Sequence, residues 1–180
     1  MPIRRKERGQ PYGTVYHAVL RFLRQLRLGS LRAAVSAGGY GQKLPHHAVG
    51  ADGSVMALAT DLGVLTGVVI DNLSGCDLVA LEANYDAFSL HGGPYPYYLK
   101  VRIASDRGHL DNKACAAEIL ELIQDGCKKF ALCHLSQTNN SPELALTTVY
   151  NVLLAAGIQP GRDVLIQAQE RNEESPFIEF

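Results

Sequence analysis

Three polar residues stand at the ends of short apolar runs in this chain. Asp61 follows the run from Val55 to Ala59, Glu82 closes residues 78–81, and His134 closes residues 130–133. Short apolar runs favour buried strands. Ligands and catalytic groups gather at the carboxyl ends of strands in open α/β sheets. We therefore expect Asp61, Glu82 and His134 to converge, and metal-assisted chemistry is the leading hypothesis, since imidazole and carboxylate groups are natural zinc ligands.

Each of these residues also has a purely structural explanation. Asp61 could cap a following helix, and a single histidine at a strand end is often only a hydrogen-bonded core residue. A buried carboxylate such as Glu82 needs a partner, and His109, just before a predicted helix, could provide it. A Glu82–His109 pair would orient the imidazole for proton transfer, or it could simply lock the loop in place.

The elements that must position these residues alternate regularly from residue 54 onward. Their order indicates an α/β fold. The glycines and prolines at 92–96 predict a loop over residues 84–98, because they exclude a long helix. Strands are predicted at 54–59, 78–82, 130–133 and 164–168, and helices at 64–73, 99–105, 112–124 with Asp111 or Asn112 as cap, and 142–157 with Ser141 as cap.

Residues 1–44 differ from the rest of the chain in charge. Residues 1–33 carry eight Lys or Arg and one Glu, whereas the remainder carries nine basic and seventeen acidic residues. We expect a basic leader, either solvated and loose or binding nucleic acid or a membrane. Within it, residues 14–35 can form an amphipathic helix and residues 37–45 a glycine-rich loop. An acidic tail at 171–180 is expected to fray.

The cysteines and the hydropathy pattern indicate an intracellular protein. The four cysteines include no CxxC pair, so we expect reduced and mostly buried thiols. No apolar stretch reaches the length of a transmembrane helix, which predicts no membrane partner. Cytoplasmic localisation is the expectation.

Five motifs in order resemble one known family. The chain resembles the second half of the YycJ/WalJ-like metallo-hydrolases, members of the metallo-β-lactamase superfamily similar to RNase Z, over about residues 45–169. The motifs are Ala59-Thr60-Asp61-Leu62-Gly63, Leu81-Glu82-Ala83-Asn84-Tyr85-Asp86, Gly93-Pro94-Tyr95-Pro96, Gly108-His109-Leu110-Asp111-Asn112, and His134-Leu135-Ser136 with residues 139–145.

The resemblance implies a fold and a role for each site residue. The fold would be a partial metallo-β-lactamase αββα sandwich, one sheet with flanking helices, covering residues 45–170. Asp61 would bridge two divalent metals, with zinc expected first and manganese or iron as the alternatives, and His134 and His46 would be further metal ligands. Glu82 and His109 would protonate the leaving group. The substrate would be a phosphodiester, as in an exonuclease, with nucleic acid as the partner.

The sequence departs from the family in two places. The superfamily's HxHxDH ligand run does not occur, and residues 1–44 do not resemble the family's first half. We therefore expect a truncated hydrolase with weak metal binding and impaired activity. The alternative is a non-catalytic remnant that binds nucleic acid or protein through its basic leader. A homo-oligomer that supplies further ligands from a second subunit is a third expectation.

Overall fold

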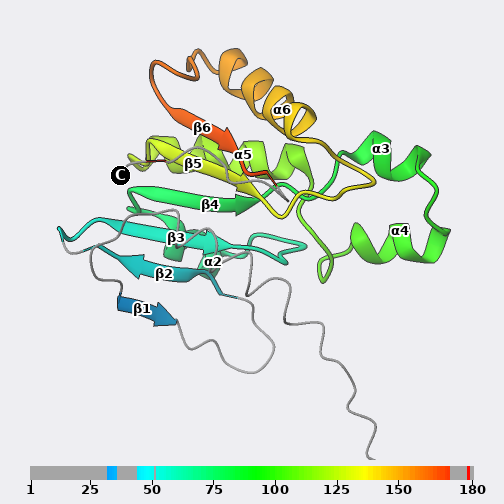
Figure 1. Ribbon diagram of the computed structural model, residues 1–180, viewed down its shortest axis with the longest axis horizontal. Helices are drawn as coiled ribbons and strands as arrows, with labels where there is room; N and C mark the ends of the chain where they lie inside the picture. Colours follow the sequence, from blue (N-terminus) through cyan, green and yellow to red (C-terminus); the bar gives the residue numbers. More distant parts are fainter. Residues whose placement is uncertain (1–31, 36–43, 51, 171–177, 179–180) are drawn as a thin grey trace, which may run out of the picture.

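The computed structural model describes residues 32–35, 44–50, 52–170 and 178, and a single sheet organises them. The sheet has six strands in the same order as in the sequence (Figure 1). The strands are β1 (Arg32–Val35), β2 (His46–Val49), β3 (Val55–Ala59), β4 (Leu78–Glu82), β5 (Lys129–Cys133) and β6 (Leu165–Ala168).

The sheet is mixed, and its parallel part sets the position of the polar strand ends. β1, β2 and β3 pair antiparallel, whereas β3 to β6 pair parallel. Ala59 pairs with Leu81, and Glu82 pairs with Cys133, one residue before His134. Because parallel strands end at the same edge, the chain segments that carry Asp61, Glu82 and His134 leave the sheet together.

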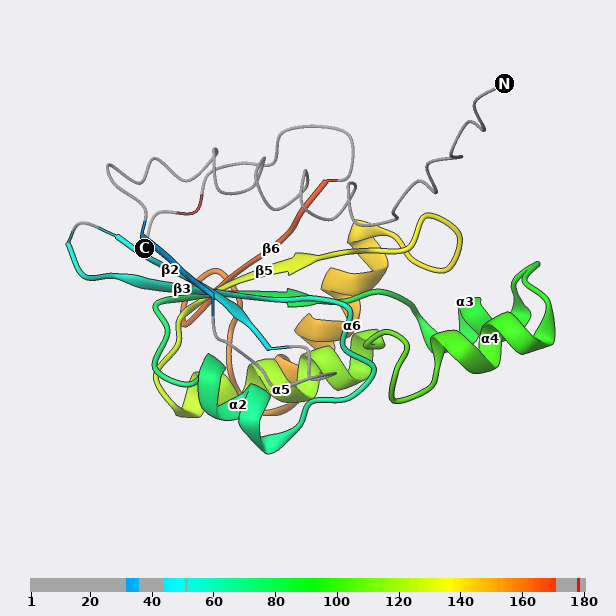
Figure 2. The ribbon, with the colours of Figure 1, turned by 90° about the horizontal axis from the view of Figure 1, so that it is seen from below.

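Three helices cover one face of the sheet (Figure 2). They are α2 (Gly67–Leu73), α5 (Asn112–Gln124) and α6 (Pro142–Ala155), capped by Thr66, Asp111 and Ser141 through side-chain oxygens that accept backbone N–H groups. Their apolar sides form the main core with alternate residues of the strands, including Leu81, Phe130, Ile119 and Val149. The predicted α/β class is therefore confirmed.

The opposite face of the sheet carries a second, smaller apolar cluster. Met56, Leu58, Leu78 and Ala131 are buried there, and Ile178, near the chain's C-terminus, packs with them at 4% exposure. No second sheet is present among the residues that the structure describes.

Two short helices project beyond the carboxyl edge of the sheet (Figures 1 and 2). They are α3 (Ala87–Gly92) and α4 (Tyr97–Ile103), and we call residues 87–107 the α3–α4 arm. The loop predicted over residues 84–98 is thus wrong. Asp86 caps α3 through its side chain, and Pro96 stands at the N-cap of α4. The glycines and prolines do exclude one long helix, but a short helix forms on each side of them, because proline is tolerated at a helix start.

The antiparallel edge of the sheet was also missed. Residues 32–35, predicted at the end of a helix, form β1, and His46 and His47, for which no strand was predicted, begin β2. β3 offers unpaired N–H and C=O groups to β2, and β2 in turn offers its other edge to β1. Pairing with these groups outweighs weak local preferences. The rest of the predicted helix over 14–35, the glycine-rich loop over 37–43 and the tail apart from Ile178 lie outside the described residues.

The remaining helix bounds differ little from the prediction. The helix expected from residue 64 begins at Gly67, where Thr66 provides the cap. Within the described ranges, no helix combines the length and the apolar character that crossing a bilayer requires. The four cysteines are free thiols, as predicted.

Candidate functional site

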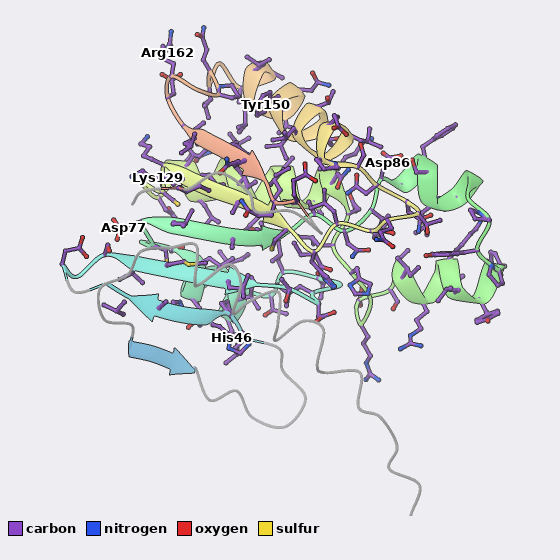
Figure 3. All side chains as sticks on the ribbon, in the orientation of Figure 1. His46, Asp77, Asp86, Lys129, Tyr150 and Arg162 are labelled. Carbon is purple, nitrogen blue, oxygen red and sulfur yellow. The ribbon has the colours of Figure 1, made fainter. Side chains whose placement is uncertain are left out.

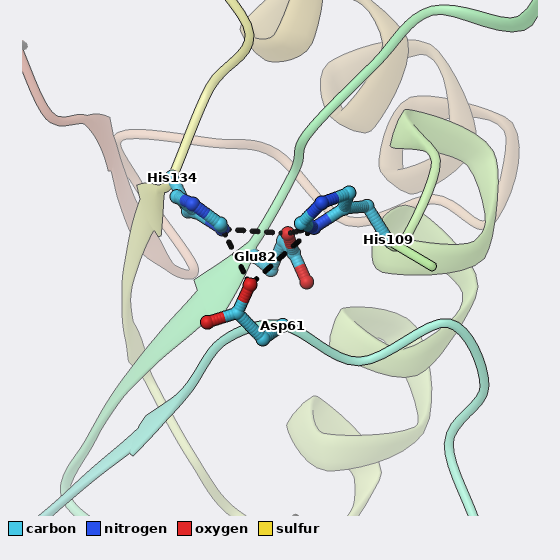
Figure 4. Close-up of side chains that lie close together, drawn as sticks. All are labelled: Asp61, Glu82, His109 and His134. Carbon is cyan, nitrogen blue, oxygen red and sulfur yellow. Dashed lines mark hydrogen bonds and ion pairs between the residues drawn. The ribbon is translucent and has the colours of Figure 1, made fainter. Parts of the chain in front are cut away.

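Four side chains from four separate segments meet at the carboxyl edge of the sheet (Figure 4). Asp61 comes from the loop after β3, Glu82 from the end of β4, His109 from the turn before α5, and His134 from the end of β5. One potential ligand atom from each side chain lies within 4.8 Å of every other. The expected convergence of Asp61, Glu82 and His134 is therefore found, with His109 as a fourth member.

Glu82 is the centre of the cluster. Its Oε1 accepts hydrogen bonds of 2.7 Å from Nδ1 of His109 and 2.7 Å from Nδ1 of His134, and its Oε2 accepts the backbone N–H of Leu62 at 2.8 Å. The side chain of Glu82 is fully buried, whereas both histidines are about 30% exposed (28% and 29%). Glu82 therefore holds the two imidazoles from the protein side while their outer edges face the solvent.

The charge state of Glu82 follows from these contacts. Burial alone would raise the pKa of its carboxyl group, because desolvation penalises the anion. The hydrogen bonds from His109 and His134 outweigh burial and hold the pKa of Glu82 below its ordinary value. An ionised carboxylate can only accept hydrogen bonds. Each imidazole must therefore carry a proton on Nδ1, which leaves the lone pair of the neutral ring on Nε2.

Asp61 lies on the solvent side of this triad and is the more accessible carboxylate. Its Oδ1 is 3.7 Å from Nδ1 of His109 and 4.0 Å from Nδ1 of His134, and its side chain is 33% exposed. Asp61 is not the cap of α2, since Thr66 fills that position. Its orientation toward the two histidines favours a functional explanation over the capping alternative.

The backbone is strained at two of the four residues. Asp61 and His134 have φ values of 61° and 56°, and they are the only non-glycine residues with positive φ in the part of the chain that the structure describes. The left-handed conformation is costly for residues with a Cβ atom, and it concentrates at functional sites. Both strained residues lie within two positions of a strand end, that of β3 or that of β5.

Buried and half-buried amides fix the loops around the cluster. The Asn84 side chain donates to the carbonyl of His134 at 2.7 Å. The side chains of Asn112 and Asn140 donate to each other's oxygens at 3.0 and 2.8 Å, and Asn140 also donates to the carbonyl of Ala83 at 2.8 Å. These bonds join the ends of β4 and β5 to the starts of α5 and α6, so the histidines stand on a rigid frame.

A close backbone approach sets the position of His109. Its N–H donates to the carbonyl of Ile103 at 2.9 Å. The preceding Gly108 packs so tightly against the carbonyls of Arg102 and Ile103 that a Cβ atom there would collide with both. Only glycine fits at this position, and the contact ties His109 to the end of α4.

The cluster opens into a cleft of about 470 Å³ between the sheet edge and the α3–α4 arm. Asp61 and His109 form its inner wall. The arm contributes one side and the loop after His134 contributes the other. The remaining lining residues are Asn84, Tyr95, Leu99, Arg102, Ile103, Arg107, Gly108, Ser136, Gln137 and Thr138.

His46 is the one predicted ligand outside the cluster. It is the exposed first residue of β2 and pairs with Leu58 of β3 (Figure 3). Its neighbour His47 contacts the carbonyl of Asn72 at 2.6 Å through Nε2. The role of His46 as a metal ligand stays a prediction.

Sequence reasoning missed several residues around the site. Arg102 and Arg107 line the cleft, and Asn84, Asn112 and Asn140 hold its loops. The motifs that contain the asparagines were visible in the sequence. However, nothing local indicates that two asparagines 28 residues apart bond to each other.

A cysteine beside the cluster belongs to the core instead. Cys133 pairs with Glu82 across β4 and β5. Burial, reinforced by the Glu82 carboxylate, raises the pKa of the Cys133 thiol far above its ordinary value. The thiolate form that binds metals or attacks substrates is therefore disfavoured at this position.

Comparison with known proteins finds similarity to two named exodeoxyribonucleases. The chain is 34% identical over 129 residues to Exodeoxyribonuclease WalJ of Streptococcus pneumoniae serotype 2, a match covering 72% of this chain and 48% of that protein. It is 37% identical over 106 residues to Exodeoxyribonuclease YycJ of Bacillus anthracis, covering 59% of this chain and 40% of that protein. The chain thus spans about half the length of the curated relatives that it matches. No family model matches the chain.

Proposed function

We propose that this chain carries the metal site and the proton-transfer pair of a hydrolase that cleaves DNA phosphodiesters, in the WalJ/YycJ family of the metallo-β-lactamase superfamily. One observation carries the proposal: Glu82 holds His109 and His134 side by side, with Asp61 next to both. The names of the relatives, which are exodeoxyribonucleases, support a nuclease-like hydrolase and a nucleic-acid substrate.

The chemistry of the cluster fits a divalent metal ion. Two carboxylates and two imidazoles offer oxygen and nitrogen ligand atoms within 4.8 Å of one another, a donor set that suits zinc, manganese or iron. Asp61 and His134 would hold the ion, and His46 is the proposed further ligand. A divalent ion held there would supply Lewis-acid polarisation of a phosphoryl oxygen and would make a water molecule more acidic.

Glu82 prepares His134 for that role. A metal-binding histidine commonly donates its other ring N–H to a carboxylate, which fixes the tautomer and the ring orientation. His134 donates from Nδ1 to Glu82, so its Nε2 carries the lone pair that would bind a metal. The buried Glu82 thus acts on His134 as a positioning residue.

The same carboxylate prepares His109 for proton transfer. Bond cleavage leaves a negative charge on the departing oxygen of the phosphodiester, and this oxygen needs a proton. A protonated His109 would donate it from Nε2, while the Nδ1–H group stays bonded to Glu82 at 2.7 Å. The Glu82 anion stabilises the positive imidazolium before the transfer. His109 lines the cleft, where a leaving group could reach it.

We expect this hydrolase to turn over slowly. The HxHxDH ligand run does not occur in the sequence, so few side chains are left to bind the metal, and three protein ligands are usual for catalytic zinc.

The alternative function is nucleic-acid or protein binding by a non-catalytic domain. The eight Lys and Arg of residues 1–33 favour it, and those residues lie almost wholly outside the described part. Cytoplasmic localisation and a homo-oligomer stay predictions.

The decisive experiment compares the 180-residue chain with its Asp61→Ala variant. We expect calorimetry to detect Mn²⁺ or Zn²⁺ binding, and a labelled linear DNA to be cleaved slowly when the metal is present. Both signals should be lost in Asp61→Ala and kept in Asp71→Ala, which removes an exposed aspartate of α2. Equal metal binding by the wild-type chain and Asp61→Ala would contradict the proposal.

A further inference from the structure

The cleft contains two arginines that the proposed hydrolysis does not use. Arg102 and Arg107 line it beside Asp61 and His109, and both are exposed. Neither guanidinium forms an ion pair with a carboxylate among the residues that the structure describes. Guanidinium groups match phosphate oxygens in charge and geometry. The two arginines are therefore suited to bind a phosphate group close to the cluster.

The same arm presents aromatic rings to the solvent. Tyr97 and Tyr98 of α4 are 82% and 73% exposed. Tyr98 lies four residues before Arg102 in the helix, so the two side chains are neighbours on one face. Exposed aromatic rings beside guanidinium groups are the side chains on which single-stranded nucleic acids stack. The guanidinium groups of the arm thus line the cleft, and the exposed rings of Tyr97 and Tyr98 lie outside that lining.

The arm also differs from its surroundings in charge. Residues 44–170 contain seven Lys or Arg and fourteen Asp or Glu, and the arm holds three of those basic residues but only one acidic residue, Asp106. The rest of this range is therefore strongly acidic. A polyanion would be repelled by most of the described surface and attracted to the arm.

Internal bonds fix the arm relative to the cluster. The Lys100 ammonium group donates to the carbonyl of His91 at 2.6 Å, which joins α4 to α3. The Tyr95 hydroxyl donates to Thr138 at 3.1 Å across the cleft. A ligand seated on the arm would therefore stand at a defined distance from Asp61 and His109.

We propose that the α3–α4 arm binds single-stranded DNA, with Arg102 and Arg107 on a backbone phosphate and Tyr97 and Tyr98 stacked on unpaired bases. Basic grooves flanked by aromatic rings are the usual means of holding single strands, because the faces of the bases are accessible only when they are unpaired. Since it takes DNA as the ligand, this inference rests on the proposed function. The arm would then hold the end of a DNA strand in the cleft.

The test measures binding without catalysis. Fluorescence anisotropy follows a labelled oligo-dT of fifteen nucleotides and a blunt duplex of equal length, with EDTA present, against the full chain. We expect Tyr98→Ala to weaken single-strand binding on the order of tenfold and Tyr98→Phe to retain it, because the ring face is kept. In Arg102→Gln/Arg107→Gln, the plot of log affinity against log salt should flatten by about 0.7, the slope expected for the loss of one phosphate contact to a single strand.

A matched control separates the arm from general charge effects. Arg162→Gln removes an exposed arginine at the opposite end of the sheet (Figure 3) and should leave binding unchanged. Residues 1–33 contribute the same background to every variant. Wild-type affinity in both Tyr98→Ala and the double arginine variant would overturn the inference, as would tighter binding of the duplex than of the single strand.

The outcome is independent of whether the chain hydrolyses DNA. If arm variants lose binding while the wild-type chain shows no metal-dependent cleavage, the hydrolase proposal fails and the arm assignment stands. If cleavage depends on Asp61 but the arm variants bind normally, the arm assignment fails alone. Circular dichroism of each variant confirms that the fold is kept, so a loss of binding reports on the arm.

Discussion

At the scale of single residues, the molecule depends on one buried carboxylate. Glu82 is fully buried, yet it stays ionised because two imidazoles and the Leu62 N–H bond to it. Removing its charge leaves those donors with a weaker acceptor. The same side chain thus contributes both to stability and to the order of the site.

The first prediction concerns Glu82→Gln. We expect it to lower the free energy of unfolding at pH 7 by about 2 kcal/mol, as hydrogen bonds to charged groups contribute roughly 1.5–3 kcal/mol. Because the pKa of Glu82 is lowered in the folded state, its contribution is present above the unfolded pKa near 4.5. It is lost as pH falls through the folded pKa. The difference between the variant and the wild-type chain should therefore shrink in acid, which urea denaturation at pH 7 and pH 4 measures.

Glu118→Gln is the matched control, and its expected effect on the free energy of unfolding does not follow that of Glu82→Gln. Glu118 is a buried residue of α5, and burial, aided by Glu121 and Asp125, raises the pKa of its carboxyl group. Ionisation of Glu118 therefore costs stability as pH rises past its unfolded pKa, so removal of the charge should be neutral or stabilising at pH 7. A loss of stability at pH 7 as large as that of Glu82→Gln would contradict this account of both residues.

Glu82→Gln also tests the site itself. Replacing the carboxylate partner of a metal-binding histidine typically weakens metal affinity 10–100-fold. Calorimetric titration with Mn²⁺ should show a decrease of that order. Unchanged affinity in a folded variant would mean that Glu82 does not position His134 for a metal.

At the scale of elements, the arm and the cluster meet at one glycine. Gly108 separates α4 from His109, and its missing Cβ allows the chain to pass against two carbonyls of α4. Side chains elsewhere could shift to make room, but these backbone atoms are held by α4. The position of His109 and that of the arm are thus coupled through Gly108.

The second prediction is that Gly108→Ala disturbs both elements. We expect a loss of about 1–3 kcal/mol in the free energy of unfolding, the usual cost of overpacking, together with slower DNA cleavage. Thermal unfolding and the cleavage assay measure the two effects. Gly92→Ala is the control, because nothing lies within 4 Å of the Cβ it would add at the end of α3. Equal stability of the two variants would show that the Gly108 contact is not tight.

At the scale of the whole molecule, both faces of the sheet are apolar. The helices cover one face, while the other carries Met56, Leu58, Leu78 and Ala131 together with Ile178. Continuous apolar runs such as residues 78–81 are expected when a strand is buried on both sides. The described sheet is therefore built to be covered on the face opposite the helices as well.

The third prediction tests the contribution of Ile178 to that face. Ile178→Ala should lower the free energy of unfolding by about 2–4 kcal/mol, as for other buried large-to-small substitutions. Leu165→Ala in β6 is the control, because its side chain is 43% exposed, and it should cost much less. Urea denaturation of both variants measures the two losses in the free energy of unfolding. A smaller loss for Ile178→Ala than for Leu165→Ala would contradict the packing of Ile178 on this face.

The sequence alone determined the parts of the molecule that depend on local patterns. The apolar runs before Asp61, Glu82 and His134 predicted β3, β4 and β5, and Asp111 and Ser141 predicted the starts of α5 and α6. These signals act within a few residues, through burial of alternate side chains and capping of free N–H groups. The pairing of Glu82 with His109 was also within reach, because a buried carboxylate requires a partner.

Only the tertiary structure decided that Glu82 bonds to both His134 and His109. His134 and Glu82 are 52 residues apart, and their bond exists because β4 and β5 lie in parallel and in register. The α3–α4 arm, with Arg102 and Arg107 beside the cluster, likewise depends on a close packing of chain segments that no short pattern encodes. β2 forms because β3 offers it hydrogen bonds, and β1 forms because β2 does the same, so long-range pairing overrides local propensity in both strands.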